Sequence, residues 1–248
     1  MMMFRRFTIT FTATLGTLFF ATLLSMSAAQ TDAPSDSPPP CEYLDIQTPY
    51  TGYDEWHKSL LDTVFKLPAD YAPNDLVSIA EAGLPGNYNV RAIIIDDLRA
   101  FAAAARERGH PVAVQSAYRS YSYQERTFNY WVRVRNSEER ARLSSARPGH
   151  SEHQLGTAID LRSEGGPAAW DLEDWAATPA GAWAVKNSWR YGFVLSYPKG
   201  TRDTVCYIYE PWHYRYMGRE LAAEIHNSGL TLREWLWLQQ PDTFRAQF

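Results

Sequence analysis

The chain has 248 residues, a formal net charge of −4 at pH 7 and 45% hydrophobic residues. This length is enough for one domain with a sizeable core, and no internal repeat divides it. The acidic balance, with a pI near 5.9, and the lack of a basic stripe argue against a nucleic-acid-binding protein.

The first 29 residues have the pattern of a secretory signal peptide. Arg5 and Arg6 supply positive charge, the stretch Phe7–Met26 is apolar, and small residues suit cleavage before Gln30. The alternative is an uncleaved membrane anchor, because the stretch approaches the length that spans a bilayer. No later segment is long and apolar enough to do so. We therefore expect export to the periplasm, cell wall or extracellular space, with membrane contact only through this segment.

Residues 30–40 form a polar, proline-rich spacer, which is expected to be a flexible or polyproline tether. Residues 41–248 are then expected to form one folded, monomeric domain. Its two cysteines, Cys41 and Cys206, are predicted to form a disulfide between the start of the domain and a late strand. The alternative is a pair of unrelated thiols.

Hydrophobic spacing and capping residues predict short strands among helices. Helices are predicted over residues 54–67, 90–108 (capped by Asn89), 121–135 (capped by Ser120), 180–191, 218–227 and 232–239, with a further turn after Ser137. Strands are predicted over residues 112–118, 157–161, 193–196, 205–209 and 213–216, and residues 147–154 are expected to form a loop. Helices grouped around an antiparallel-type sheet define the class α+β.

Three residues are predicted to bind a catalytic zinc ion, one per chain: His153, Asp160 and His213. Two imidazoles and one carboxylate are a ligand set of catalytic zinc, and they suit zinc better than magnesium or calcium. Gly156 allows a tight turn between the first two ligands, and a predicted strand gives Asp160 rigid support. For these two residues alone, the alternative is a loop histidine and a helix-capping aspartate without a metal.

Glu210 is predicted to be the general base. It lies three residues before His213, and Pro211 favours an extended conformation at Glu210, so that both side chains can converge on one pocket. Zinc acidifies water, and a carboxylate within hydrogen-bond distance accepts the proton and later passes it to the leaving amine. His150 lies close to the motif that contains His153 but outside the spacing of the predicted ligands.

Five further residues are assigned to the substrate side of the pocket. Arg119 follows a predicted strand end, where its guanidinium would stabilise the oxyanion formed at the scissile carbonyl or bind a substrate carboxylate. Gln124 lies one helical turn further on, and Ser151 is placed to hydrogen-bond a substrate terminus. Trp212 and Tyr191 are predicted to wall the pocket.

Four motifs, spread over roughly residues 54–237, resemble the VanY-type D-alanyl-D-alanine carboxypeptidases. They are, in chain order, Ser-Ala-Tyr-Arg-Ser at 116–120, Pro-Gly-His-Ser-Glu-His-Gln-Leu-Gly-Thr-Ala-Ile-Asp at 148–160, Tyr-Gly-Phe at 191–193 and Glu-Pro-Trp-His-Tyr-Arg-Tyr at 210–216. The resemblance implies a Hedgehog/D,D-peptidase-like fold, a small antiparallel sheet flanked by helices, with one zinc at the three ligands above. It implies that Glu210 is the base, that Arg119 stabilises the transition state, and that Ser151 and Gln124 contact the terminal carboxylate of the peptide. Cys206 stands where the family often has glycine, which leaves the chemistry untouched and supports the disulfide.

The resemblance and the residues together predict a zinc-dependent carboxypeptidase that removes the C-terminal D-alanine from peptidoglycan stem peptides. An L,D-carboxypeptidase of tetrapeptide stems and a D-Ala-D-Ala dipeptidase are the enzyme alternatives. A dipeptidase needs a pocket for a free amine, to which no extra acidic residue is assigned. A non-catalytic wall-binding module is disfavoured because the three ligands and Glu210 are all present.

Overall fold

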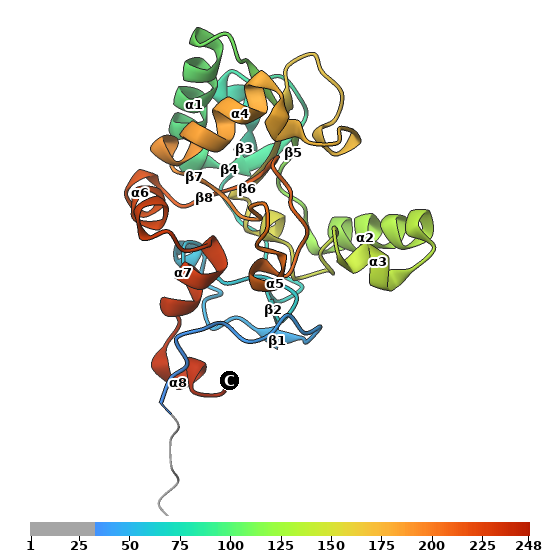
Figure 1. Cartoon of the computed structure of the whole chain (residues 1–248), viewed down its shortest axis with the longest axis vertical. Coiled ribbons are helices and arrows are strands. Elements are labelled where there is room, and N and C mark those ends of the chain that lie inside the picture. Colours follow the sequence, from blue (N-terminus) through green and yellow to red (C-terminus); the bar gives the residue numbers. More distant parts are fainter. Residues whose placement is uncertain (1–32) are drawn as a thin grey trace, which may run out of the picture. The chain divides into compact units, whose positions relative to one another are not determined.

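A four-stranded antiparallel sheet forms the centre of the protein, whose structure is a computed structural model (Figure 1). The strands are, in spatial order, β5 (Val112–Ser116), β6 (Ala158–Ser163), β8 (His213–Tyr216) and β7 (Phe193–Leu195). The three neighbouring pairs are antiparallel, which confirms the predicted α+β class. The structure describes residues 33–248, and the predicted signal peptide lies outside them. No helix within residues 33–248 has the length and apolar character needed to cross a bilayer.

The strand register brings together positions that are far apart in the sequence. Asp160 on β6 pairs with His213 on β8 on one side and with Ser116 on β5 on the other. Residues directly opposite one another in antiparallel strands have Cβ atoms about 5 Å apart. The sheet therefore places two of the predicted zinc ligands side by side.

Helices α1 (Ile95–Glu107) and α4 (Pro179–Asn187) lie together beside the sheet, in the upper part of Figure 1. Leu98 and Phe101 of α1 are fully buried. The Phe101 ring packs against Phe193 of β7 with ring centroids 5.8 Å apart. Burial of one such side chain contributes about 1.5–3 kcal/mol, so this shared core holds α1 firmly against the sheet.

A second hydrophobic cluster surrounds the C-terminal helices α6 (Arg219–Ser228), α7 (Leu232–Leu238) and α8 (Asp242–Arg245). Phe65 stacks on Trp237 of α7 with ring centroids 6.0 Å apart. This contact joins the N-terminal part of the domain to its C-terminal end.

Shorter elements complete the described chain. Two small sheets pair β1 (Ile46–Gln47) in parallel with β2 (Phe65–Lys66), and β3 (Leu76–Ser78) antiparallel with β4 (Asn89–Arg91). The 3₁₀ helices are η1 (Tyr53–Glu55), η2 (Ile79–Ala82), η3 (Ala92–Ile94), η4 (Glu152–Leu155), η5 (Ala169–Asp171), η6 (Trp175–Ala177) and η7 (Ser188–Tyr191). A one-turn helix, α5 (Arg202–Val205), lies between β7 and β8.

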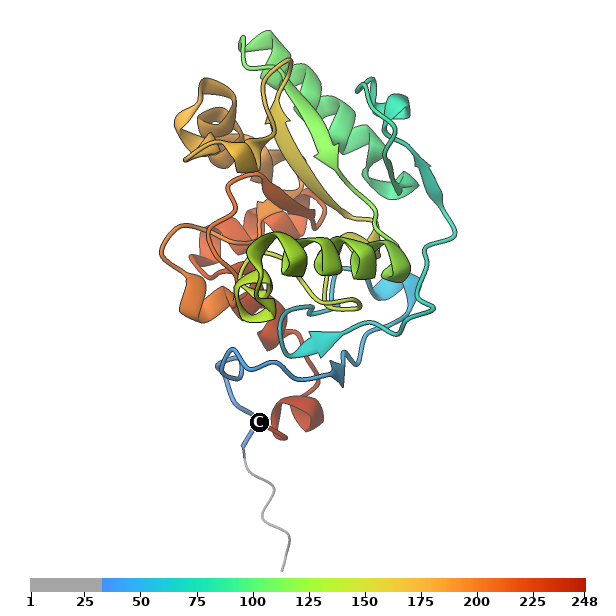
Figure 2. The same ribbon diagram turned by 90° about the vertical axis from the view of Figure 1, so that its right-hand side faces the viewer.

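Helices α2 (Tyr121–Arg135) and α3 (Glu138–Arg142) form an arm that projects from the sheet, as Figures 1 and 2 show. The hydroxyls of Ser120 and Ser137 accept hydrogen bonds from backbone N–H groups in the first turns of α2 and α3. Asn136 ends α2 in a left-handed conformation, with φ of 48°. The prediction of α2 from residue 121 to residue 135 is confirmed, because its caps are encoded locally.

The predicted helix over residues 54–67 is wrong. The chain forms only η1 and then an irregular segment that ends in β2. The Asp62 carboxylate accepts hydrogen bonds from the backbone N–H groups of Val64 and Phe65, at 2.7 and 2.8 Å, and so replaces helical carbonyl acceptors. The hydrophobic spacing predicted burial in this segment but not its backbone conformation.

Two further element predictions need correction. α1 begins at Ile95 rather than just after Asn89, because residues 89–91 pair with β3 as β4. The predicted strand over residues 205–209 is wrong, since α5 ends at its first residue and Cys206 has φ of 71°, outside the strand region. Cys206 forms the predicted disulfide with Cys41, with Cα atoms 5.2 Å apart. The bridge thus joins the start of the domain to a turn rather than to a strand.

The described part of the predicted linker is anchored to the C-terminal helices. The Ser35 carbonyl accepts hydrogen bonds from Trp237 Nε1 at 2.9 Å and from Arg245 at 3.0 Å. The Pro39 carbonyl accepts one from Arg233 at 3.0 Å. A flexible or polyproline tether was expected for residues 30–40. In the described part, carbonyls of this proline-rich segment accept hydrogen bonds from side chains that are distant in the sequence.

Candidate active site

A cleft of about 830 Å³ opens beside the central sheet and the α2 arm. The predicted site residues that line it are Arg119, Ser151, His153, Asp160, Glu210, Trp212 and His213. Figure 2 faces the side of the molecule on which α2 runs across the view just below β5 and β6. The cleft therefore collects most of the predicted residues in one place, although they come from separate parts of the chain.

His153, Asp160 and His213 form a buried cluster in which one ligand atom of each residue lies within 4.8 Å of the others. His153 Nδ1 is 2.7 Å from the Ala117 carbonyl, so this nitrogen carries the proton and donates it. His153 Nε2 then faces Asp160 Oδ2 at 3.2 Å. His213 Nδ1 lies 3.0 Å from Asp160 Oδ1. The Asp160 carboxylate thus sits between the two imidazoles.

These three residues fit a zinc ion. His153 Nε2 is buried and forms no hydrogen bond with any group in residues 33–248. A buried imidazole nitrogen without a partner is costly, and a metal ion is a common reason for its presence. Two histidines and one aspartate match the donors of catalytic zinc sites that leave a fourth position open. The Ala117 carbonyl supports His153 as the outer partners of zinc-binding histidines commonly do.

Glu152, for which the sequence predicted no role, contacts the ligand cluster from behind. Its Oε2 lies 2.9 Å from His213 Nε2 and accepts a hydrogen bond from the Ser196 hydroxyl at 2.7 Å. Its Oε1 accepts one from Arg215 at 3.0 Å, and all four residues are buried. A carboxylate behind a zinc-binding histidine fixes the ring orientation and its tautomer. Glu152 therefore directs His213 Nδ1 toward the ligand cluster.

The buried charges of this cluster are strongly coupled. Burial and the Arg119 charge lower the pKa of His153 to about 4, so its ring is neutral at pH 7. Burial also disfavours the charged forms of His213, Glu152 and Asp160, but the hydrogen bonds and charges of their neighbours have a larger effect on their pKa values. Hydrogen bonds to Asp160 and Glu152 raise the pKa of His213 to about 10. Arg215 and His213 hold the pKa of Glu152 at about 2, and the two imidazoles hold the pKa of Asp160 well below its usual range.

Glu210 lies in the same cleft, on the segment that leads into β8. Its carbonyl accepts a hydrogen bond from the His213 backbone N–H at 3.1 Å, which closes a turn between the two residues. Within residues 33–248 its carboxylate forms no hydrogen bond or ion pair, and burial raises its pKa to about 8. A carboxyl group whose pKa is close to neutral can act both as a base and as an acid.

Arg119 contributes the positive charge of the cleft. Its backbone N–H donates to the His153 carbonyl at 3.2 Å, and its guanidinium donates to the Ser116 hydroxyl, also at 3.2 Å. Burial lowers its pKa, while the carboxylates of Asp160 and Glu210 act in the opposite direction. Arginine remains charged in proteins, so a cation stands beside the ligand cluster.

Ser151 and Gln124 are held by contacts within the protein. The Ser151 hydroxyl caps η4 by accepting a hydrogen bond from the His153 backbone N–H at 3.4 Å. Gln124 Nε2 donates to the Ala146 carbonyl at 2.6 Å, and Gln124 lies behind the cleft rather than on its wall. Gln124 Oε1 is buried without a partner in the described part of the chain.

The two aromatic residues predicted to wall the pocket differ. Trp212 lines the cleft. The placement of Tyr191 in the cleft is wrong: its ring packs against Phe101, with centroids 5.8 Å apart, and beneath the Arg219 guanidinium, in the core beside α1. Tyr197, which had no predicted role, instead lines the cleft and lies over His213 with ring centroids 4.8 Å apart.

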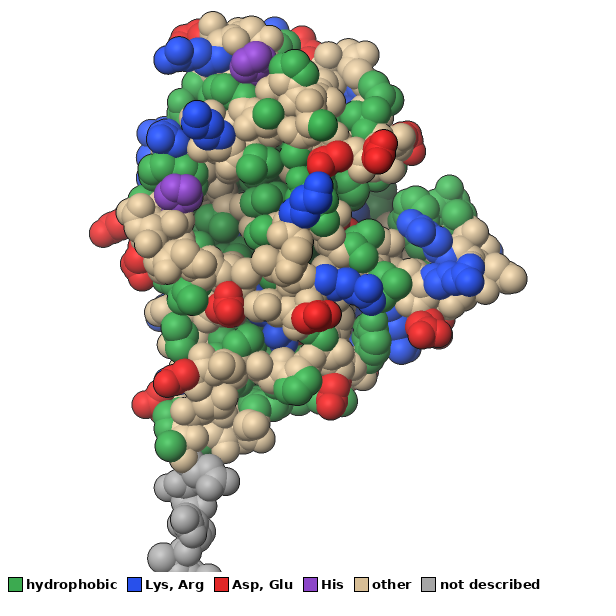
Figure 3. All heavy atoms as spheres, in the orientation of Figure 1, with side chains coloured by type: hydrophobic (Ala, Val, Ile, Leu, Met, Phe, Trp, Pro, Cys, Tyr) green, Lys and Arg blue, Asp and Glu red, His purple; other side chains and the backbone are tan. Residues whose placement is uncertain are grey.

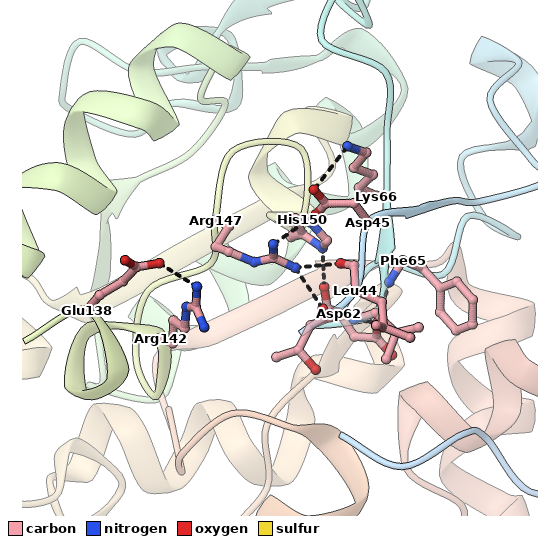
Figure 4. A network of polar contacts seen from close by, with 11 residues as sticks. Leu44, Asp45, Asp62, Phe65, Lys66, Glu138, Arg142, Arg147 and His150 are labelled. Carbon is pink, nitrogen blue, oxygen red and sulfur yellow. Dashed lines mark hydrogen bonds and ion pairs between the residues drawn. The ribbon is translucent and has the colours of Figure 1, made fainter. Parts of the chain in front are cut away.

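His150 belongs to a separate polar network, shown in Figure 4. Its Nδ1 lies 2.8 Å from the Asp62 carbonyl and its Nε2 lies 2.9 Å from Asp45 Oδ1. Arg147 donates to Asp45 and to the Leu44 carbonyl, at 2.8 and 2.5 Å. The network ties the N-terminal segment to the loop that carries His153, so His150 has a structural position.

Comparison with known proteins identifies the family. The family model VanY, described as D-alanyl-D-alanine carboxypeptidase, matches residues 87–219, which is more than half of the chain. A D-alanyl-D-alanine carboxypeptidase of Enterococcus faecalis (strain ATCC 700802 / V583) is 31% identical over 191 residues. That alignment covers 73% of this chain and 66% of the relative, so the chain spans just under two thirds of the relative's length.

Solved structures show the same fold. The LD-carboxypeptidase LdcB has a TM-score of 0.64 and 33% identity, with 74% of this chain and 87% of that chain covered. A mutant of the vancomycin-resistance D,D-pentapeptidase VanY from a VanB-type cassette, in complex with Zn(II), has a TM-score of 0.62 and 29% identity. That match covers 73% of this chain and 99% of the other.

Proposed function

Because the chain belongs to the VanY family of D-alanyl-D-alanine carboxypeptidases, we propose that it removes the C-terminal D-alanine from peptidoglycan stem peptides in a zinc-dependent reaction. The observation that carries the proposal is the buried cluster of His153, Asp160 and His213, with Glu210 in the same cleft. We further propose that residues 41–248 form the catalytic domain of an exported monomer that holds one zinc ion.

His153, Asp160 and His213 would hold the zinc ion, which supplies the Lewis acidity that polarises the scissile carbonyl and acidifies water. Glu210 accepts the proton of the attacking water and then donates it to the nitrogen of the departing D-alanine as the C–N bond breaks. Its raised pKa of about 8 supports both roles, since a group with a pKa near neutrality can take and return a proton.

Arg119 stabilises the negative charge that develops on the carbonyl oxygen of the substrate. Its position supports this role, because the guanidinium donates to the Ser116 hydroxyl and the Arg119 backbone N–H donates to the His153 carbonyl, so that little rearrangement is needed during the reaction. Binding of the substrate's terminal carboxylate is the alternative role. Ser151 is proposed to contact that carboxylate, and Trp212 is proposed to form a wall beside it. Gln124, which lies behind the cleft, is proposed to act indirectly, by holding the Ala146 carbonyl in place.

A second candidate reaction is removal of D-alanine from tetrapeptide stems, where the preceding centre has the L configuration. The likeness to the LD-carboxypeptidase LdcB favours it, since LdcB has a TM-score of 0.64 and the D,D-pentapeptidase VanY one of 0.62. Both reactions use the same ligands and the same base, so they differ only in the configuration accepted before the scissile bond.

The experiment that tests the proposal measures release of free D-alanine from purified stem pentapeptide and tetrapeptide. We expect release from at least one of them, loss of release after treatment with a chelator, and recovery after addition of zinc. The ratio of kcat/KM for the two substrates separates the D,D reaction from the L,D reaction. Release that is unaffected by complete removal of metal would contradict the zinc-dependent mechanism.

A further inference from the structure

The cleft continues along α2, beyond the residues assigned to catalysis. The side chains of α2 that line it are Tyr123, Arg126, Thr127, Tyr130, Trp131 and Arg135. Their spacing of three, four or seven residues along the helix places them on one face. Figure 3 shows several Lys and Arg side chains on the α2–α3 arm. The outer wall of the cleft is therefore aromatic and basic.

Arg126 and Arg135 are held in place by neighbouring aromatic rings. The Arg126 guanidinium lies 5.6 Å from the centre of the Tyr123 ring, and that of Arg135 lies 5.5 Å from the centre of the Trp131 ring. Such contacts restrict a cation without neutralising it. Neither arginine forms an ion pair with a carboxylate in residues 33–248, in contrast to Arg142 on α3, which pairs with Glu138. Both remain able to bind an anion from solution.

Charge is unevenly distributed along the cleft. The only acidic residues among those that line it are Asp160 and Glu210, at the ligand cluster beside Arg119. The side chains of α2 that line the cleft include Arg126 and Arg135 and no acidic residue. A substrate that occupies the whole cleft would thus place its scissile bond at the ligand cluster and a negative group beside α2.

The length of this wall corresponds to a peptide of several residues. Tyr123 and Arg135 are separated by about 18 Å along the helix axis, at 1.5 Å per residue. An extended chain covers that distance in about five residues. A stem peptide has this length, and its glutamyl residue, linked through the γ-carboxyl group, keeps a free α-carboxylate upstream of the scissile bond unless it is amidated.

We propose that the α2 face is a binding subsite for the acidic, glycan-proximal half of the stem peptide, in which Arg126 or Arg135 binds the free glutamyl α-carboxylate. This inference rests on the proposed function and adds a source of selectivity to it. The guanidinium group favours such a role because its planar fork matches a carboxylate in two hydrogen bonds. The enzyme should then distinguish acidic stem peptides from amidated ones.

The test compares three substrates: a stem peptide with a free glutamyl α-carboxylate, its amidated counterpart, and a short N-acylated D-Ala-D-Ala without upstream residues. The variant is Arg126→Gln combined with Arg135→Gln. The matched control is Arg133→Gln, because Arg133 is an exposed arginine of the same helix that does not line the cleft. All three proteins are assayed for kcat and KM at low and high salt.

We expect the wild-type protein and the control to prefer the free carboxylate by about five- to tenfold in kcat/KM, mainly through KM, since an exposed charge pair affects binding moderately. The double variant should lose this preference while its kcat/KM for the short substrate stays within about twofold, and high salt should reduce the preference of the wild type.

Equal loss on acidic and amidated peptides, or the same loss in the control, would overturn the subsite. Activity of the wild type on all substrates without preference refutes the subsite alone. Absence of D-alanine release from every substrate refutes the proposed function itself.

Discussion

Two buried histidines, three residues apart on one loop, have opposite surroundings. His150 and His153 are each only 1% exposed. Both ring nitrogens of His150 lie within hydrogen-bond distance of oxygen atoms, one from Asp62 and one from Asp45. His153 donates through Nδ1 alone, and its Nε2 faces a carboxylate and a second imidazole without a hydrogen bond in the described chain.

The difference shows that burial by itself does not identify a metal ligand. A buried histidine whose two nitrogens are satisfied stabilises the fold, as Figure 4 illustrates for the network around His150. A buried histidine with one unsatisfied nitrogen next to Asp160 and His213 needs a partner that residues 33–248 do not supply. Substitutions around His153 should therefore affect zinc binding and catalysis, whereas substitution of His150 should affect stability.

The largest effect is expected for Glu210→Gln. The amide cannot accept the proton of water, so kcat should fall by at least about 10²–10⁴-fold. Zinc content and the unfolding temperature should stay close to wild type, because the Glu210 carboxylate has no hydrogen bond to lose within residues 33–248. Steady-state release of D-alanine measures kcat, metal analysis measures zinc content, and thermal unfolding measures stability. If the variant kept more than about a tenth of its turnover, another group would have to be the base.

Arg119→Lys should produce the next largest loss. Lysine keeps the charge but not the planar fork, so an oxyanion donor would lose about 10²-fold in kcat with little change in KM. The same experiment decides between the two roles of Arg119. A greatly raised KM with unchanged kcat would show that the residue binds the substrate carboxylate instead.

Glu152→Gln should weaken zinc binding by about 10–100-fold without abolishing it, since partners behind a ligand typically contribute this much to affinity. The amide keeps the size of the side chain and can still accept from Ser196, but it removes the charge that faces His213 and Arg215. Competition with a chromophoric chelator would measure the affinity. Unchanged affinity would mean that Glu152 serves only to neutralise Arg215.

Zinc affinity should also depend on pH. Without metal, the pKa of His213 is about 10 and that of Glu210 is about 8, so His213 is protonated at pH 7. His213 must lose its Nδ1 proton to bind zinc, and binding that releases a proton becomes tighter as the pH rises. We expect affinity to increase about tenfold per pH unit between pH 6 and 8. Calorimetry in buffers of different ionisation enthalpy would count the released protons, and a count of zero would contradict this assignment.

Local signals explain what the sequence made predictable. The caps Ser120 and Ser137 define α2 and α3. The strands predicted over residues 157–161 and 213–216 are present as β6 and β8, and the structure adds the register that pairs Asp160 with His213. The predicted ligands and base lie in two compact motifs whose residue types match zinc chemistry, so residue type, rather than proximity in sequence, linked the two motifs.

What the sequence did not reveal depends on distant partners. Glu152 gains its role from Ser196 and Arg215, which are 44 and 63 residues away. Arg215, two residues after His213 on β8, is the one signal that could have indicated a buried acid nearby. Tyr191 was misplaced because its ring fits the core beside α1 as well as an aromatic residue fits a pocket wall.

The most direct test of the central claim is the zinc content of purified protein carrying His153→Gln, compared with His150→Gln as the matched control. We expect about one zinc per chain in the wild type and in the His150 variant, and less than about a tenth of that in the His153 variant, since three protein ligands are needed to retain the ion. The His150 variant should instead lose about 1–3 kcal/mol of unfolding free energy, because it leaves buried groups unsatisfied. Full zinc content in the His153 variant, or a wild-type protein that binds no zinc, would contradict the account.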